Sequence, residues 1–301
     1  MITATPSPAE LVVGLRGPSP RYKRAEMDRV LEHLDECEQE LLSVLREAVD
    51  DVVGFGEREG PSSFALLYAL HLLARHRSEA AHELLLALLR EPEETVDRLL
   101  GDAVTEDLGT WLYATAGGSP QGIERLASDR TVWEWVRSAA VDARAMLGDS
   151  DPALRDETVV FLQALLMDDE EPDGGEAPTA AAKALLDLGH GESADLLREA
   201  IQQERLDPWA MDASDIDIAL SEAGQAGEYV GGRLARYLPE DDPHKALSWW
   251  AAFEENRDDS SPWLAPSPGQ DRKAVVKKAG VKKKSRNKAE KKARRKQRKR
   301  R

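Results

Sequence analysis

The sequence holds two stretches of the same design, VRSAAVDARAMLG at residues 136–148 and PTAAAKALLDLG at residues 178–189. Each is rich in alanine and closes on Leu-Gly, and the two closing glycines are 41 residues apart. Alanine favours helix, and a glycine just after a helix takes the left-handed conformation that ends it. A spacing of this length is typical of HEAT-type helical repeats. The two stretches therefore predict stacked helical hairpins, with Gly148 and Gly189 as the helix ends.

The same helical period continues along the chain. In residues 78–90 the apolar residues Ala81, Leu84, Leu85 and Leu88 are spaced by three or four positions, which places them on one helix face. Residues 104–113 and 152–167 show a similar single stripe. No segment alternates apolar and polar residues between hairpin turns, as a β-strand would.

Short breaks separate these segments, at residues 60–62, 91–92, 117–120 and 148–152. We therefore predict an all-α, HEAT-like helical-repeat solenoid, an α-α superhelix with a disordered basic C-terminal tail. The alternative is an irregular helical domain in which the two alanine-rich stretches are alike by chance.

Four regions follow from the composition. Residues 1–21 are expected to form a flexible N-terminal arm, in which Leu11-Val12-Val13 could dock as a brief helix. Residues 22–255 form the helical domain, 256–271 a Pro/Ser-rich linker, and 272–301 a disordered Lys/Arg-rich tail. The start of the sequence has no positive region followed by a long apolar stretch, so we expect no signal peptide and a cytoplasmic protein.

Charge is divided sharply along the chain. Residues 272–301 hold 18 of the 41 Lys and Arg residues and one of the 56 acidic residues, a net charge of +17. The other residues therefore hold 23 bases and 55 acids, a net charge of −32. Such a tail binds polyanions by releasing their counterions, and its lack of aromatic residues argues against base stacking. We expect RNA, DNA or a ribosome as its partner, with an acidic protein, the chain's own acidic body or, least of all, an anionic membrane as alternatives.

Fourteen tail cations are the predicted polyanion-binding residues: Lys282, Lys283, Lys284, Arg286, Lys288, Lys291, Lys292, Arg294, Arg295, Lys296, Arg298, Lys299, Arg300 and Arg301.

Motifs for catalysis are scarce. The sequence has no phosphate-binding glycine loop, no GxSxG and no HExxH. Its six histidines form no i,i+4 pair, and the single cysteine, Cys37, is expected to be a structural thiol. Neither catalytic residues nor a metal or cofactor is predicted. The acidic run 168–176 is interpreted as a solvated loop.

One acidic group at a helix start is a second candidate surface. Asp102 is expected to cap a helix that begins near residue 103, and Thr105 and Glu106 lie in its first turn. Capping is the simpler interpretation. The alternative is a metal-assisted enzyme, which requires Asp102, Glu106 and another carboxylate to meet in a concave pocket with raised pKa values.

Several short motifs resemble a known bacterial family. They are Leu99-Leu100-Gly101-Asp102 with Thr105-Glu106-Asp107-Leu108, then Val136-Arg137-Ser138-Ala139-Ala140, then Ser248-Trp249-Trp250-Ala251-Ala252-Phe253. In this order they are similar to the domain of unknown function 1186 family, over roughly residues 22–255. The resemblance implies a HEAT-like helical fold and no established activity.

The chain departs from that family at its end. Many members end in a SEC-C zinc motif built on Cys-x-Cys and a later Cys-Cys or Cys-His pair, whereas no cysteine follows Cys37 here. The zinc site is therefore not carried over. We expect a non-enzymatic scaffold whose helical surface binds an unknown protein and whose tail holds a polyanion. A purely structural protein, whose tail neutralises its own body, is the third alternative.

Overall fold

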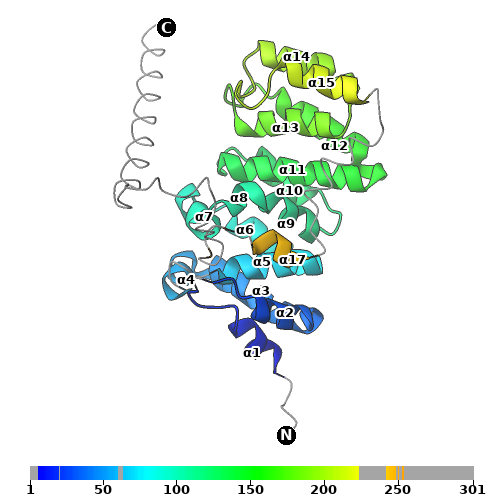
Figure 1. The fold of residues 1–301 in the computed structure, drawn as a ribbon. Helices are drawn as coiled ribbons and strands as arrows, with labels where there is room; N and C mark the ends of the chain where they lie inside the picture. The colour runs from blue at the N-terminus through cyan, green and yellow to red at the C-terminus, as the bar shows by residue number, and fades with distance from the viewer. Residues whose placement is uncertain are drawn as a thin grey trace, which may run out of the picture. The chain divides into compact units, whose positions relative to one another are not determined.

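The computed structural model describes residues 6–19, 21–59, 64–223, 242–248, 250 and 253. Within these residues the chain forms sixteen α-helices and two short 3-10 helices, with no β-strand (Figure 1). The helices pack against one another in sequence order. This confirms the predicted all-α solenoid.

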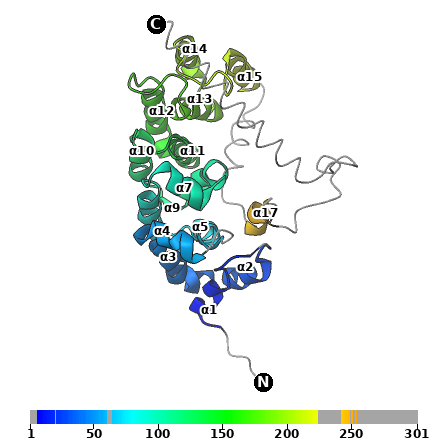
Figure 2. The ribbon, with the colours of Figure 1, turned by 90° about the vertical axis from the view of Figure 1, so that its left-hand side faces the viewer.

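The solenoid is a series of helix pairs. The pairs are α3 (Leu34–Asp50) with α5 (Ala65–His76), α6 (His82–Leu88) with α9 (Leu108–Thr115), α10 (Gln121–Ser128) with α11 (Glu134–Ser150), α12 (Pro152–Leu166) with α13 (Glu176–Asp187), and α14 (Ala194–Gln202) with α15 (Ala213–Ala223). The helices α5, α9, α11 and α13 pack one on the next, and we call them the central row (Figure 2). Each pair thus buries its apolar face against its neighbour, as in other helical repeats.

Shorter elements complete the described structure: α1 (Pro8–Val13), α2 (Arg24–Leu31), α4 (Val52–Glu59), η1 (Glu79–Ala81), α7 (Glu93–Leu100), α8 (Ala103–Glu106), η2 (Gly191–Ser193) and α17 (Pro243–Leu247).

The first helix belongs to the packed structure. Ser7 and Glu10 form a capping box at the start of α1, and Leu11 is buried where α1 packs on α3. Just after α1, the guanidinium of Arg16 binds the carboxylates of Glu47 and Glu59 at 2.6 and 2.7 Å. The described part of segment 1–21 is therefore held in place, whereas its prolines suggested a flexible arm.

The two alanine-rich stretches lie in neighbouring helices of the central row, α11 and α13. Gly189 follows α13 with φ of +67°, which confirms the predicted left-handed helix end. The prediction for Gly148 is wrong, because α11 continues through it to Ser150. A Cβ atom at this position would lie 2.2 Å from Oγ1 of Thr158 on α12. Gly148 thus permits a close approach of two helices and does not end one.

Ion pairs join the acidic loop 168–176 to Arg130 and Arg137 of the preceding repeat, and we call this arrangement the clamp. Glu171 is buried, and its carboxylate pairs with the buried guanidinium of Arg137 on α11. Arg130 also binds the loop, through Glu170 at 2.7 Å and through Asp168. The interpretation as a solvated loop was wrong for this part, because the sequence did not show that arginines from neighbouring helices converge on it.

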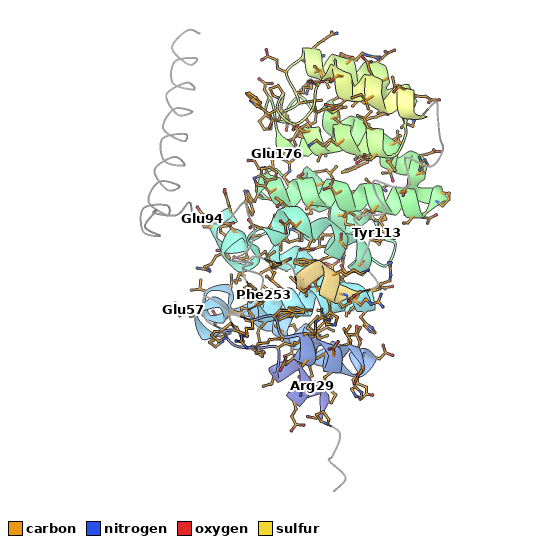
Figure 3. The ribbon with its side chains drawn as sticks, in the orientation of Figure 1. Arg29, Glu57, Glu94, Tyr113, Glu176 and Phe253 are labelled. Carbon is orange, nitrogen blue, oxygen red and sulfur yellow. The ribbon has the colours of Figure 1, made fainter. Side chains whose placement is uncertain are left out.

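A late segment returns to the first helix pair. We call residues 242–253 the return segment, of which 242–248, 250 and 253 are described. Its helix α17 packs on α5, and His244 lies 2.7 Å from the hydroxyl of Tyr22 and 2.8 Å from Oδ1 of Asp28. Phe253, which is labelled in Figure 3, packs against Phe64, and their ring centroids are 4.9 Å apart. The return segment is therefore fixed by both hydrogen bonds and aromatic contacts.

The predicted linker 256–271 and tail 272–301 lie outside the described residues. Among the helices that are described, none has the length and apolar character needed to cross a membrane.

The clamp gives a direct stability prediction. Replacing Glu171 with alanine leaves the buried Arg137 guanidinium without its carboxylate, so we expect the free energy of unfolding to fall by about 3–5 kcal/mol. Glu170→Ala removes a carboxylate from the same loop whose side chain is 78% exposed, and should cost only about 0–1 kcal/mol. Urea unfolding of both variants measures the difference. If both variants lower the free energy of unfolding equally, the buried Glu171–Arg137 pair does not stabilise the fold more than an exposed ion pair does.

Candidate functional site

A hollow opens between α8, α9 and α11. It measures about 420 Å³, including space open to solvent, and we call it the α8–α11 pocket. It is lined by Val104, Thr105, Glu106, Gly109 and Thr110 from α8 and α9, and by Trp135, Ser138, Ala139, Asp142 and Met146 from α11.

The local sequence explains why the pocket forms here. The α11 residues that line it are spaced by three or four positions and so share one helix face. The opposite wall is not one helix, as the stripe at 104–113 suggested, because the chain breaks at Asp107 into α8 and α9. At its floor α9 and α11 approach closely, since a Cβ on Gly109 would lie 3.1 Å from the carbonyl oxygen of Ala139.

The lining of the pocket is partly apolar and partly polar. Val104, Ala139 and Met146 are buried, whereas Trp135 is 37% exposed and so lies at the rim. Hydroxyl groups and carboxylates occupy the remaining wall. The site therefore combines apolar side chains, an indole ring and oxygen atoms that can accept hydrogen bonds.

Two carboxylates give the pocket its electrostatic character. Burial, together with the charge of Asp187, raises the pKa of Asp142 to about 7. Burial and the neighbouring Asp102 also raise the pKa of Glu106. No basic residue lines the pocket, and the interactions of the described residues include no hydrogen bond or ion pair to either carboxylate. Lys183 on α13 lowers the pKa of Asp142, but burial outweighs this effect, so a cation inside the pocket would stabilise the ionised form of both carboxylates.

A buried polar cluster lies between α5, α9 and the return segment. The imidazole of His71 meets the ring of Trp111 edge-on at 5.1 Å, and the ring of Trp250 lies 6.3 Å away. Nε2 of His71 is 3.8 Å from Oδ2 of Asp107, which is too long for a hydrogen bond. Burial lowers the pKa of His71 to about 3 and raises that of Asp107 to about 7, so below pH 7 the contact is not an ion pair.

A family model described as a protein of unknown function (DUF1186) matches residues 10–253. The chain belongs to this family. No curated protein and no solved structure matches it. The match runs from α1 to the last residue of the return segment, so the DUF1186 region includes both the α8–α11 pocket and the contacts that fix the return segment.

In this DUF1186 chain, the pocket includes only two of the three residues predicted as a helical-body surface, Asp102, Thr105 and Glu106. Thr105 and Glu106 line the pocket, and Asp102 does not. Asp102 occupies the N-cap position of α8, but its side chain makes no capping hydrogen bond, so the capping prediction is wrong in that respect. Its carbonyl oxygen instead accepts a hydrogen bond of 3.0 Å from the hydroxyl of Thr105.

Sequence reasoning missed Asp142 and Trp135. Asp142 is an acid among alanines on the helix face that carries Ala139 and Met146, and this unusual placement was the available signal. The predicted structural role of Cys37 agrees with its burial inside α3, which raises the pKa of its thiol. The described residues hold no group of three or more His, Cys, Asp or Glu side chains that could bind a metal ion.

The buried cluster predicts a pH-dependent stability. In the folded protein Asp107 holds its proton up to about pH 7, whereas in the unfolded chain it ionises near pH 3.8. Its contribution to folding is therefore lost as the pH rises from 4 to 7. We expect the free energy of unfolding of Asp107→Asn, relative to the unaltered protein, to increase over this range, as measured by urea unfolding.

Asp195→Asn is the control for the loss of one surface charge, since its side chain is 99% exposed. A difference between Asp107→Asn and the unaltered protein that stays constant from pH 4 to 7 would contradict the burial of Asp107 as a protonated acid.

Proposed function

We propose that this DUF1186 protein is an interaction scaffold. Its helical body receives a segment of a partner protein at the α8–α11 pocket, and its basic tail attaches the complex to RNA, DNA or a ribonucleoprotein particle. The observation that carries this proposal is the pocket itself, whose lining combines an exposed indole with two carboxylates that make no hydrogen bond or ion pair with a described residue.

The central row suits such a role. Helices that pack one on the next over their apolar faces hold a surface with little rearrangement, and helical-repeat proteins bind partners along surfaces of this kind. An aromatic residue at the rim contributes contact area at a small entropic cost, as it does in protein interfaces generally.

The tail adds a second, electrostatic attachment. Its fourteen predicted cations lie outside the described residues, so the support comes from their charge alone. Joining a specific but weak surface to a weak polyanion anchor raises the effective concentration of each partner. Neither contact then needs to be tight by itself.

An enzyme remains the second candidate, favoured by one observation. Burial raises the pKa of Asp142 to about 7 and also raises that of Glu106, and a carboxylate that keeps a proton near neutral pH, as Asp142 does, can serve as a general acid or base. This candidate predicts chemical conversion of a bound ligand. The scaffold predicts that the ligand is recovered unchanged after prolonged incubation, which mass spectrometry measures.

The tail makes a quantitative prediction. We expect the full chain to bind duplex DNA and RNA, with an affinity that falls by about 10³- to 10⁵-fold between 50 and 200 mM salt if six to ten phosphates are contacted. The tail-neutral variant, in which all 18 Lys and Arg residues of 272–301 are replaced by glutamine, should lose this binding. Fluorescence anisotropy across a salt series measures both.

Two results would contradict the polyanion anchor. One is an absence of binding by the full chain at 50 mM salt, and the other is equal binding by the tail-neutral variant.

A further inference from the structure

We propose that the α8–α11 pocket recognises the ammonium group of a lysine side chain in a partner protein. This inference rests on the proposed scaffold function and specifies the chemistry of its ligand. Three features of the pocket support it: the carboxylate within it, its apolar lining and the indole at its rim.

The carboxylate of Asp142 is the first feature. It is half-buried in the pocket wall and receives no hydrogen bond from a described residue. An ionised carboxylate taken out of water is costly unless it is paired, so this position favours a ligand that brings a positive charge and several donors. An ammonium group supplies three N–H donors and no acceptor.

The surrounding groups favour a cation at the end of an aliphatic chain. Val104, Ala139 and Met146 form an apolar surface along which methylene groups can lie. The hydroxyl of Ser138 and the carboxylate of Glu106 provide further acceptors near the ammonium. A chain of four methylenes that ends in a charge can contact both the apolar and the polar residues of this lining.

The indole of Trp135 is the third feature. It is exposed at the rim although it comes from the central row, where most large apolar side chains are buried. The face of a tryptophan attracts an ammonium or its neighbouring methylenes through a cation–π interaction, and tryptophan is the strongest side chain in this respect. An exposed indole beside two carboxylates is therefore explained by a cationic ligand.

The charged groups around Asp142 set the pH dependence of binding. Glu106 faces it from α8, Asp187 and Lys183 act on it from α13, and α9 presents no titratable side chain to the pocket. A lysine ligand binds the ionised form of Asp142. Since that group titrates near pH 7, the affinity should fall about tenfold from pH 8 to pH 6.

The test uses the full chain and three short capped peptides of equal length, one with a central lysine, one with acetyl-lysine and one with norleucine. The probe is the NMR resonance of the indole N–H group of Trp135, which is assigned by its absence from the spectrum of the Trp135→Phe variant. We expect the lysine peptide to shift it in a saturable manner, and the acetyl-lysine and norleucine peptides to bind at least tenfold more weakly.

Asp142→Asn should weaken binding of the lysine peptide at least tenfold at pH 8 and remove its pH dependence. Glu157→Gln is the matched control, because it removes one negative charge from an exposed position on α12, outside the pocket. The same titration with the tail-neutral variant separates binding from any competition by the chain's own lysines.

Each outcome decides between the proposals. Equal shifts by the lysine and norleucine peptides would overturn the lysine inference and leave the pocket as a docking site. A lysine peptide that binds Asp142→Asn as tightly as the unaltered chain would also overturn it. No shift with any peptide, in either the full chain or the tail-neutral variant, would overturn both the inference and the docking role of the body.

Discussion

The close packing of α11 against its neighbours is the constraint on which the described structure depends. This helix contacts α9 and α13 in the central row and α10 and α12 in the paired helices. Its small residues let backbones approach, and Gly148 on α11 and Gly109 on α9 mark the points where even a Cβ atom would crowd the neighbouring helix. Such close packing leaves α11 little room to shift, because moving one closely packed helix pushes on its neighbours.

The same constraint creates the candidate site. Since the chain breaks at Asp107, the wall opposite α11 consists of the short helix α8 and the start of α9, and these leave part of the face of α11 uncovered. Asp142 and Trp135 lie on that uncovered face. Asp107 points instead to the buried cluster with His71 and Trp111, so one break serves both an open acidic pocket and a closed polar core.

Periodicity predicted the helical solenoid because each helix needs one apolar stripe and the sequence displays it. The acidic helix start near residue 103 also marked Thr105 and Glu106 as a candidate binding surface, and both line the pocket. Periodicity could not show which role Gly148 has. Glycine is favoured both at a left-handed helix end and where two helices approach closely, and Gly148 has the second role. Nor could periodicity reveal Trp135 or the Arg137–Glu171 pair, because these depend on which helices meet across the repeat, whereas the acid at Asp142 among alanines was a signal that went unused.

The central claim is that the carboxylate of Asp142, which makes no hydrogen bond or ion pair with a described residue, binds the ammonium group of a partner's lysine. Its pKa, measured in the full chain by carbon-13 NMR titration of the side-chain carboxyl, tests this most directly. We predict a value of about 7 in the free protein and a clear fall when the lysine peptide is added. A value near the ordinary 3.8 of aspartate in the free protein, unchanged by the peptide, would contradict the account.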